Sequence, residues 1–547
     1  MQPRQPVHSL PIFFGYFKMH FLLINPFCPI SEGPTPPLGI AFLAAALEKA
    51  GICVKILDLV ITPYSKERLA VILDEFKPDI VGTTAVTMTF LDAIQVIKDA
   101  KEIKSSILTV MGGPHVSFCA LETLNQYQEL DLIVIGEGET TVVELVEEAQ
   151  RSRDWSKIKG LAYRKGIDVC ISPARELADV NTLPLPARHL LPIGRYRALN
   201  TAISMTTSRG CPCRCIFCVG RKMVGAKVRY RNPQDVVDEM AYLATLGFPQ
   251  INIADDLFTA KKSHCITICD EIIRRKLDIQ WTSFSRVDTV SPEILQKMKE
   301  AGCTTISFGV ESANAEILKL VKKGITIAKV IKAIRMCIDV GIDPHVSFIL
   351  GLPGETPETL KETQDFGVVL DSMGGSYGFH LLAPFPGTAV YDENEKYDLS
   401  ILTKDWPQYH ANRAIVETSA VKKEMLNEIA EHWDSAVISK LESIKHQVKK
   451  GEASEFDAWQ IYNLERFTFL YDLMMTRLIE EKGAWFNGEK PVDKEDALQT
   501  LAEKIHQQAG KSRDETFNFL KDLVLRNGLN YVNEKGTIRW EWNEYLS

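Results

Sequence analysis

The chain has 547 residues and a mass of 61.4 kDa, which at about 100–200 residues per domain suggests several domains. Hydrophobic residues make up 45% and charged residues 24%, a composition typical of a folded globular protein and too apolar for a disordered one. The net charge of −8 argues against a general nucleic-acid binder, and no stretch approaches the roughly 20 apolar residues that span a bilayer. We therefore expect no nucleic-acid partner and no membrane span.

Residues 19–150 alternate short apolar runs with amphipathic helical patterns, and residues 1–18 before them are predicted to be a loose extension. The apolar runs are His20–Ile24, Cys53–Leu57, Asp79–Thr83, Ile107–Met111 and Leu132–Ile135. Strands that alternate with helices predict a parallel, doubly wound sheet. Ligands of such sheets bind beyond the carboxyl ends of the strands.

A second series of strand and helix patterns fills residues 201–400, after a mixed, proline-containing segment at 151–200 that predicts a connection. Six strand–helix units in this series predict a partial barrel, because eight units are needed to close a complete one. Residues 401–547 show long amphipathic patterns and almost no strand signal, which predicts an all-helical C-terminal domain. The predicted fold class is therefore α/β with a helical C-terminus.

The strongest chemical signal is the segment Thr207–Cys218, which follows the first strand of the second series. Cys211, Cys215 and Cys218 stand on one short loop in the spacing Cys-x-x-x-Cys-x-x-Cys. Thiolates are the favoured ligands of iron–sulfur clusters, and three thiolates leave one iron of a four-iron cubane open to a small ligand. Cys213 lies between the others and is predicted not to be a ligand, because it would force a different register.

A zinc site is the alternative for these thiols, but it would need a second Cys or His pair at ligand spacing. No such pair lies nearby in the sequence. The other cysteines are scattered, mostly in apolar surroundings, which is typical of buried thiols. We therefore expect a reducing, cytoplasmic location.

This motif, at the end of the first strand of a partial barrel, resembles that of the radical S-adenosylmethionine (SAM) enzymes. The resemblance implies that Cys211, Cys215 and Cys218 hold a [4Fe–4S] cluster whose open iron chelates SAM. It further implies reductive cleavage of SAM to a 5′-deoxyadenosyl radical, with electrons from a donor such as flavodoxin or ferredoxin.

Later strand ends resemble the SAM-binding segments of the same superfamily. Asp255 matches the acidic group that receives the SAM amino group, with Asp256 beside it, and Arg286 could pair with the SAM carboxylate. Glu311 could accept hydrogen bonds from ribose hydroxyls or the ammonium. Ordinary helix caps and salt bridges are the alternative for all of these residues.

Upstream, Pro36–Gly39, Gly112–His115 and Gly136–Glu139 resemble the cobalamin-binding domain that precedes many radical SAM cores. The resemblance places Thr84, Thr87 and Gly113 along the nucleotide tail of cobalamin. The loop after the first strand lacks the Asp-x-His-x-x-Gly pattern whose histidine ligates cobalt in domains of the methionine-synthase type. The most similar group contains anaerobic magnesium-protoporphyrin monomethyl ester cyclases and cobalamin-dependent radical SAM methyltransferases.

Three functions follow as hypotheses. The first is a cobalamin-dependent radical SAM methyltransferase that methylates an unactivated carbon of a small-molecule substrate. The second is a radical SAM oxidoreductase or cyclase of the protoporphyrin-ester type, which labelled-methyl transfer would separate from the first. The third is a non-catalytic cobalamin or iron–sulfur sensor, which would release no 5′-deoxyadenosine.

Overall fold

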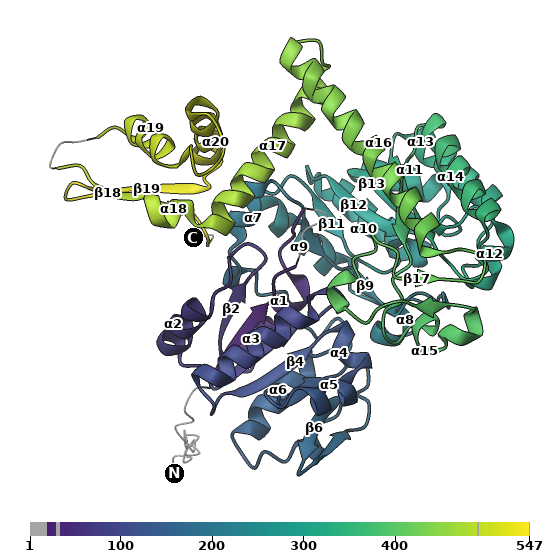
Figure 1. The fold of residues 1–547 in the computed structure, drawn as a ribbon, viewed down its shortest axis with the longest axis horizontal. Helices are drawn as coiled ribbons and strands as arrows, with labels where there is room; N and C mark the ends of the chain where they lie inside the picture. The colour runs from purple at the N-terminus through teal and green to yellow at the C-terminus, as the bar shows by residue number, and fades with distance from the viewer. Residues whose placement is uncertain (1–18, 29–32, 489–491, 546–547) are drawn as a thin grey trace, which may run out of the picture.

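The computed structural model describes residues 19–28, 33–488 and 492–545, so the predicted extension at 1–18 lies outside the described residues. Figure 1 shows three parts: an N-terminal sheet with its helices, a larger group of strands and helices, and a C-terminal region reached through a long helical hairpin. None of the helices in the described ranges has the length and apolar character needed to cross a bilayer.

A seven-stranded sheet forms the N-terminal part, in the order β2-β1-β3-β4-β5-β6-β7. Its first five strands pair in parallel, as predicted. Helices α1 (Leu38–Lys49) and α6 (Glu139–Ala149) pack on one face, and α2 (Lys66–Phe76) and α3 (Phe90–Ile103) pack on the other. The parallel strands are β1 (His20–Asn25), β2 (Cys53–Asp58), β3 (Ile80–Thr84), β4 (Leu108–Gly112) and β5 (Leu132–Val134). Because helices cover both faces, ligands reach this sheet at its carboxyl edge.

Two antiparallel strands extend this sheet from the segment that the sequence predicts to be only a connection. They are β6 (Leu161–Lys165), which pairs with β5, and β7 (Asp168–Ile171), which pairs with β6. Gly166 turns the chain between them with a φ of 65°. These strands are short, and Ile171 is half exposed on the outer strand, so the apolar pattern that marks a strand is weak here.

Six parallel strands form the second sheet in the order β15-β14-β13-β12-β11-β8, which is the predicted partial barrel. The strands are β8 (Ile203–Met205), β11 (Ile251–Ile253), β12 (Trp281–Ser285), β13 (Cys303–Glu311), β14 (Asp343–Leu350) and β15 (Ser376–Leu381). The main helices between them are α9 (Pro233–Thr245), α10 (Lys262–Arg275), α11 (Pro292–Glu300), α13 (Ile327–Val340) and α14 (Pro357–Ser372). Strand order follows chain order, so the loops at the carboxyl ends lie along one edge.

The C-terminal region is mainly helical, as predicted, and it also contains a three-stranded antiparallel sheet. The prediction of an all-helical domain therefore needs correction. The sheet has the order β18 (Ala484–Phe486), β20 (Thr537–Trp542) and β19 (Leu529–Glu534). Along β20 every second residue is buried, which is the period of a strand with one covered face. The covered side chains Ile538, Trp540 and Trp542 pack with the neighbouring helices.

A long helical hairpin leads from the barrel to this sheet. It consists of α16 (Lys423–Lys450) and α17 (Glu455–Thr476), and α18 (Leu478–Lys482), α19 (Lys494–Ile505) and α20 (Arg513–Leu525) follow. Trp433 of α16 packs against Tyr377 and Phe379 of the outer strand β15. The hairpin thus covers part of the edge at which the barrel is open.

Candidate functional site

The cysteine motif lies on a loop of residues 210–228, here called the cysteine loop. The short strands β9 (Ser208–Arg209) and β10 (Arg229–Tyr230) pair antiparallel and bring the two ends of this loop together. At its start Gly210 adopts a φ of 114°, and a Cβ there would lie 2.6 Å from the Lys227 carbonyl oxygen. Only glycine fits this turn, so the local sequence closes the loop at its base.

The three predicted cluster ligands lie on this loop, where Cys211 and Cys215 are partly buried and Cys218 is exposed. The Gly220 amide donates a hydrogen bond to Cys218 Sγ at 3.3 Å, and Cys215 Sγ lies 3.9 Å from the Lys322 carbonyl oxygen. Burial raises the pKa of Cys215 to about 11. This thiol therefore becomes a thiolate chiefly when a metal takes the place of its proton.

Cys213 interacts with the first of the three thiols. A hydrogen bond between their side chains raises the pKa of Cys211 and lowers the pKa of Cys213 to about 6. In the part of the chain that the structure describes, no three His, Cys, Asp or Glu side chains are gathered around one metal-ion position. Three thiols on one loop fit the donor set of an iron–sulfur cluster.

Asp255 and Asp256 follow β11 and point to different surroundings. Asp255 is buried and accepts hydrogen bonds from the Thr207 amide, the Thr207 hydroxyl and the Ser208 hydroxyl, each at 2.6 Å. Burial raises the pKa of Asp255 although these hydrogen bonds favour its charged form. Asp256 accepts from the Gly210 amide at 3.2 Å and lines the cavity described below. Asp255 therefore orders the entry to the cysteine loop, whereas Asp256 faces the cavity.

Lys323, which the sequence analysis missed, contacts both Arg286 after β12 and Glu311 at the end of β13. Lys323 Nζ lies 2.7 Å from Glu311 Oε1, and both side chains are less than 10% exposed. The Lys323 carbonyl oxygen accepts from Arg286 Nη2 at 2.8 Å, and Arg286 also pairs with Asp288. In the sequence, Lys322-Lys323-Gly324 looks like an ordinary exposed charged turn, so only the fold reveals this contact.

Glu311 is held in an uncommon backbone conformation. Its φ is 75°, and the pairing of β13 with β14 shifts register between Gly309 and Glu311. A Cβ at Gly309 would lie 2.5 Å from Glu311 Oε1 and 3.0 Å from Lys323 Nζ. The glycine therefore makes room for the Glu311–Lys323 pair at the strand end.

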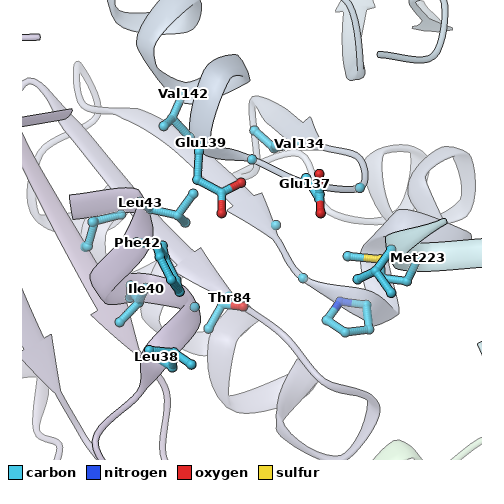
Figure 2. A pocket seen from close by; sticks show the side chains of 18 of the residues that line it. Leu38, Ile40, Phe42, Leu43, Thr84, Val134, Glu137, Glu139, Val142 and Met223 are labelled. Carbon is cyan, nitrogen blue, oxygen red and sulfur yellow. The ribbon is translucent and has the colours of Figure 1, made fainter. Parts of the chain in front are cut away.

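A cavity of about 370 Å³ separates the carboxyl edge of the N-terminal sheet from the cysteine loop. Leu38 and Phe42 of α1 line its N-terminal side, together with the loops after β3, β4 and β5. Arg209, Met223 and Asp256 line the opposite side. Figure 2 shows Phe42, Glu137, Glu139 and Met223 around this space. The cavity is therefore bordered by the predicted cobalamin edge on one side and by Asp256 and the start and helix of the cysteine loop on the other. The remaining predicted cluster and SAM residues are not among its lining residues; these are Cys211, Cys215, Cys218, Asp255, Arg286 and Glu311.

The predicted cobalamin residues divide into two groups. Thr84 and Gly113 line the cavity. Thr87 is buried away from it, with its hydroxyl 3.3 Å from His115 Nδ1. His115 packs between Phe90 and Trp406, and burial lowers its pKa to about 4. Apolar walls with glycine turns and a few polar groups fit a large organic cofactor at this edge.

Gly113 shows why glycine is needed at this edge. Its φ is 100°, and a Cβ would lie 2.6 Å from the Ala85 carbonyl oxygen and 2.7 Å from the Thr84 hydroxyl. The loops after β3 and β4 thus meet more closely than a larger residue would permit.

Comparison with known proteins identifies the family to which the chain belongs. The family model described as "Radical SAM superfamily" matches residues 205–367, and the model described as "B12 binding domain" matches residues 30–146. The chain is 36% identical over 397 residues to a Pyrococcus horikoshii protein named uncharacterized methyltransferase PH0819, covering 72% of this chain and 86% of that protein.

Two further similarities extend this result. The chain is 33% identical over 376 residues to an anaerobic magnesium-protoporphyrin IX monomethyl ester cyclase of Cereibacter sphaeroides, covering 66% of this chain but only 60% of that protein. The solved structure of OxsB, a cobalamin-dependent SAM radical enzyme with aqua-cobalamin and SAM bound, matches 93% of this chain and 80% of its own chain. The TM-score is 0.67 at 19% identity, so this likeness shows a shared fold.

The chain belongs to the radical SAM superfamily, with a B12-binding domain ahead of the radical SAM domain. The two family matches correspond to the two sheets that border the cavity.

Proposed function

We propose that this protein is a cobalamin-dependent radical SAM methyltransferase that methylates an unactivated carbon of a small molecule. The observation that carries the proposal is a cavity between the carboxyl edge of the B12-binding sheet and the cysteine loop. A methyl group and a radical centre must meet at one substrate carbon, so both sources need to face the same enclosed space.

Cys211, Cys215 and Cys218 would hold the [4Fe–4S] cluster, and Thr84 and Gly113 would border cobalamin. When bound, the cluster with SAM supplies a carbon-centred radical, and cobalamin supplies a methyl carrier. Thr87 would stabilise the carboxyl edge of the B12-binding sheet outside the cavity, through its contact with His115. The chain's own part is to align these groups and to exclude water from the apolar cavity.

For SAM, we propose that Asp256 receives the amino group, because Asp255 already accepts three protein hydrogen bonds. Asp255 keeps a role as the residue that orders Thr207 and Ser208 at the entry to the cysteine loop. Arg286 would bind the SAM carboxylate, and Glu311 would accept hydrogen bonds from SAM while Lys323 holds it in place.

An electron donor would approach the exposed side of the cysteine loop. Arg214 and Lys227 are exposed there, which favours an acidic partner such as flavodoxin or ferredoxin. Arg229 and Arg231, which follow the cysteine loop in the sequence, are instead paired inside the protein with Glu137 and Glu239. We also propose a cytoplasmic location, because the cysteines outside the cysteine loop are scattered and mostly in apolar surroundings.

The test is anaerobic reconstitution with iron, sulfide, cobalamin and SAM carrying a labelled methyl group. We expect absorption by both metallocofactors, release of 5′-deoxyadenosine, and labelled methyl in the product when candidate small molecules are supplied. Turnover of a substrate without transfer of label would favour an oxidoreductase or cyclase, and bound cofactors without 5′-deoxyadenosine would favour a sensor.

A further inference from the structure

Two arginines lie opposite each other at the base of the cysteine loop. Arg209 of β9 and Arg229 of β10 are direct partners in the antiparallel pair. Both side chains are only 14% exposed. Like charges placed directly opposite on paired strands repel, so the closed base requires a nearby negative charge.

Glu137, from the loop after β5 of the B12-binding domain, supplies that charge. Its carboxylate accepts two hydrogen bonds from Arg229, at 2.6 and 2.9 Å, and one from Arg209 at 3.4 Å. The Glu137 side chain is 9% exposed. Burial alone would raise the pKa of Glu137, but the two guanidinium groups hold it below its ordinary value. One buried carboxylate thus joins both ends of the cysteine loop to the other domain.

Arg229 also contacts two backbone carbonyl groups, one of them within the cysteine loop. Its guanidinium also donates to the Val224 carbonyl oxygen at 2.9 Å and to the Ala178 carbonyl oxygen at 2.6 Å. Val224 ends the short helix α8 (Gly220–Val224), which begins two residues after Cys218 and lines the cavity with Met223 and Val224. A shift of Arg229 would therefore move both the thiol-bearing segment and the cavity wall.

Glu139, two residues further along the chain at the start of α6, offers a contrast. It pairs with Arg209 at 2.7 Å, and no contact joins it to Arg229 in the described structure. Arg209 also lies 4.8 Å above the ring of Phe42. Glu139 thus contacts one strand of the base, whereas Glu137 contacts both.

We propose that Glu137 is a positioning residue that fixes the cysteine loop against the B12-binding domain. It sets the placement of the three thiols relative to the cavity through Arg209 and Arg229. The part of this inference that concerns the cluster rests on the proposed function. The part that concerns the loop rests on the protein contacts alone.

The first test is hydrogen exchange of the full-length protein without cofactors, comparing wild type with Glu137→Gln. Glutamine keeps the size of the side chain but removes the charge. We expect peptides from residues 210–228 to exchange at least about tenfold faster, because both buried guanidinium groups lose a charged partner. Unchanged exchange of these peptides in the folded variant would overturn the proposal.

Matched variants separate positioning from general stability. Glu139→Gln should accelerate exchange of the loop less than Glu137→Gln does. Asp522→Asn removes the partner of the buried Arg466 in the C-terminal region and should leave the loop unchanged. If Glu137→Gln fails to fold, Arg229→Lys replaces it, because lysine keeps the charge but cannot form both contacts. If Asp522→Asn accelerates exchange of the loop as much as Glu137→Gln or Arg229→Lys does, the proposal is also overturned.

A second readout follows the cluster in reconstituted protein. We expect Glu137→Gln to release iron to a chelator several-fold faster than wild type at equal thermal stability, and Asp522→Asn to match wild type. Equal release rates, together with unchanged exchange, would reject Glu137 as a positioning residue. A wild-type protein that holds no cluster would reject the proposed function, while the exchange experiment would still decide the role of Glu137.

Discussion

Two strand-end loops of this protein each bury a glutamate, but the surroundings of the two side chains differ. Glu137 follows β5 and meets two guanidinium groups, which keep its pKa low although burial opposes this. Glu355 follows β14, and among the described residues it accepts from the Gly351 and Leu352 amides alone, at 2.7 and 3.0 Å. Burial raises the pKa of Glu355 to about 8. Glu355 is the more deeply buried of the two and meets no cation, so it holds its proton, whereas Glu137 meets two cations and stays charged.

The contrast also predicts opposite contributions to the pH dependence of stability. Glu137 stabilises the fold above its ordinary pKa, and that contribution is lost as the pH falls. Glu355 binds its proton more tightly when folded, so its contribution is present below the ordinary pKa and is lost as the pH rises to about 8. Burial and the presence of a cationic partner together therefore decide how each glutamate contributes to stability as the pH changes.

The largest expected effect comes from removing a partner cation. Lys323→Met leaves Glu311 buried without its partner, at a cost of about 3–5 kcal/mol in the free energy of unfolding. Urea unfolding measures this loss. Lys361→Met is the control, because Lys361 pairs with Asp365 on the surface and should change little. Equal effects of the two variants would contradict the importance of the buried pair.

A smaller effect is expected from Glu355→Gln, which removes the titrating group. The free energy of unfolding of wild type should fall relative to the variant between pH 4.5 and about 8, by roughly 4 kcal/mol at most. Urea unfolding at pH 5 and pH 8.5 measures the difference. A constant difference between the two proteins across this range would show that Glu355 does not titrate there.

These contacts mark the limit of what the sequence reveals. The βα units were predictable because each one is a local pattern, and Cys211, Cys215 and Cys218 were found together because the loop is short. The contact between Glu137 and Arg229 was not predictable, because Arg229 lies 92 residues away in another domain. The separate surroundings of Asp255 and Asp256 also depend on how β11 meets the cysteine loop. In the C-terminal region, the alternation of Ile538, Trp540 and Trp542 indicates a strand. The sequence analysis assigned the whole region as helical because long amphipathic patterns precede these residues.

The smallest expected effect compares Thr84 with Thr87. Thr84 lines the cavity and Thr87 lies behind it, so we expect Thr84→Ala to weaken cobalamin binding by about two- to tenfold, the value of one hydrogen bond. Thr87→Ala should change cobalamin affinity less. Spectroscopic titration of the two variants with cobalamin measures both. A larger loss in Thr87→Ala would place the cofactor differently from the proposal.

The central claim is that three thiols, and not Cys213, hold a cluster with an open iron. Its most direct test is anaerobic reconstitution of wild type, Cys213→Ala and Cys215→Ala, followed by iron analysis and by measurement of 5′-deoxyadenosine from SAM under reduction. We predict that wild type and Cys213→Ala hold a four-iron cluster and cleave SAM, and that Cys215→Ala does neither. A cluster lost with Cys213, or a wild-type protein that holds zinc at these thiols, would contradict the claim.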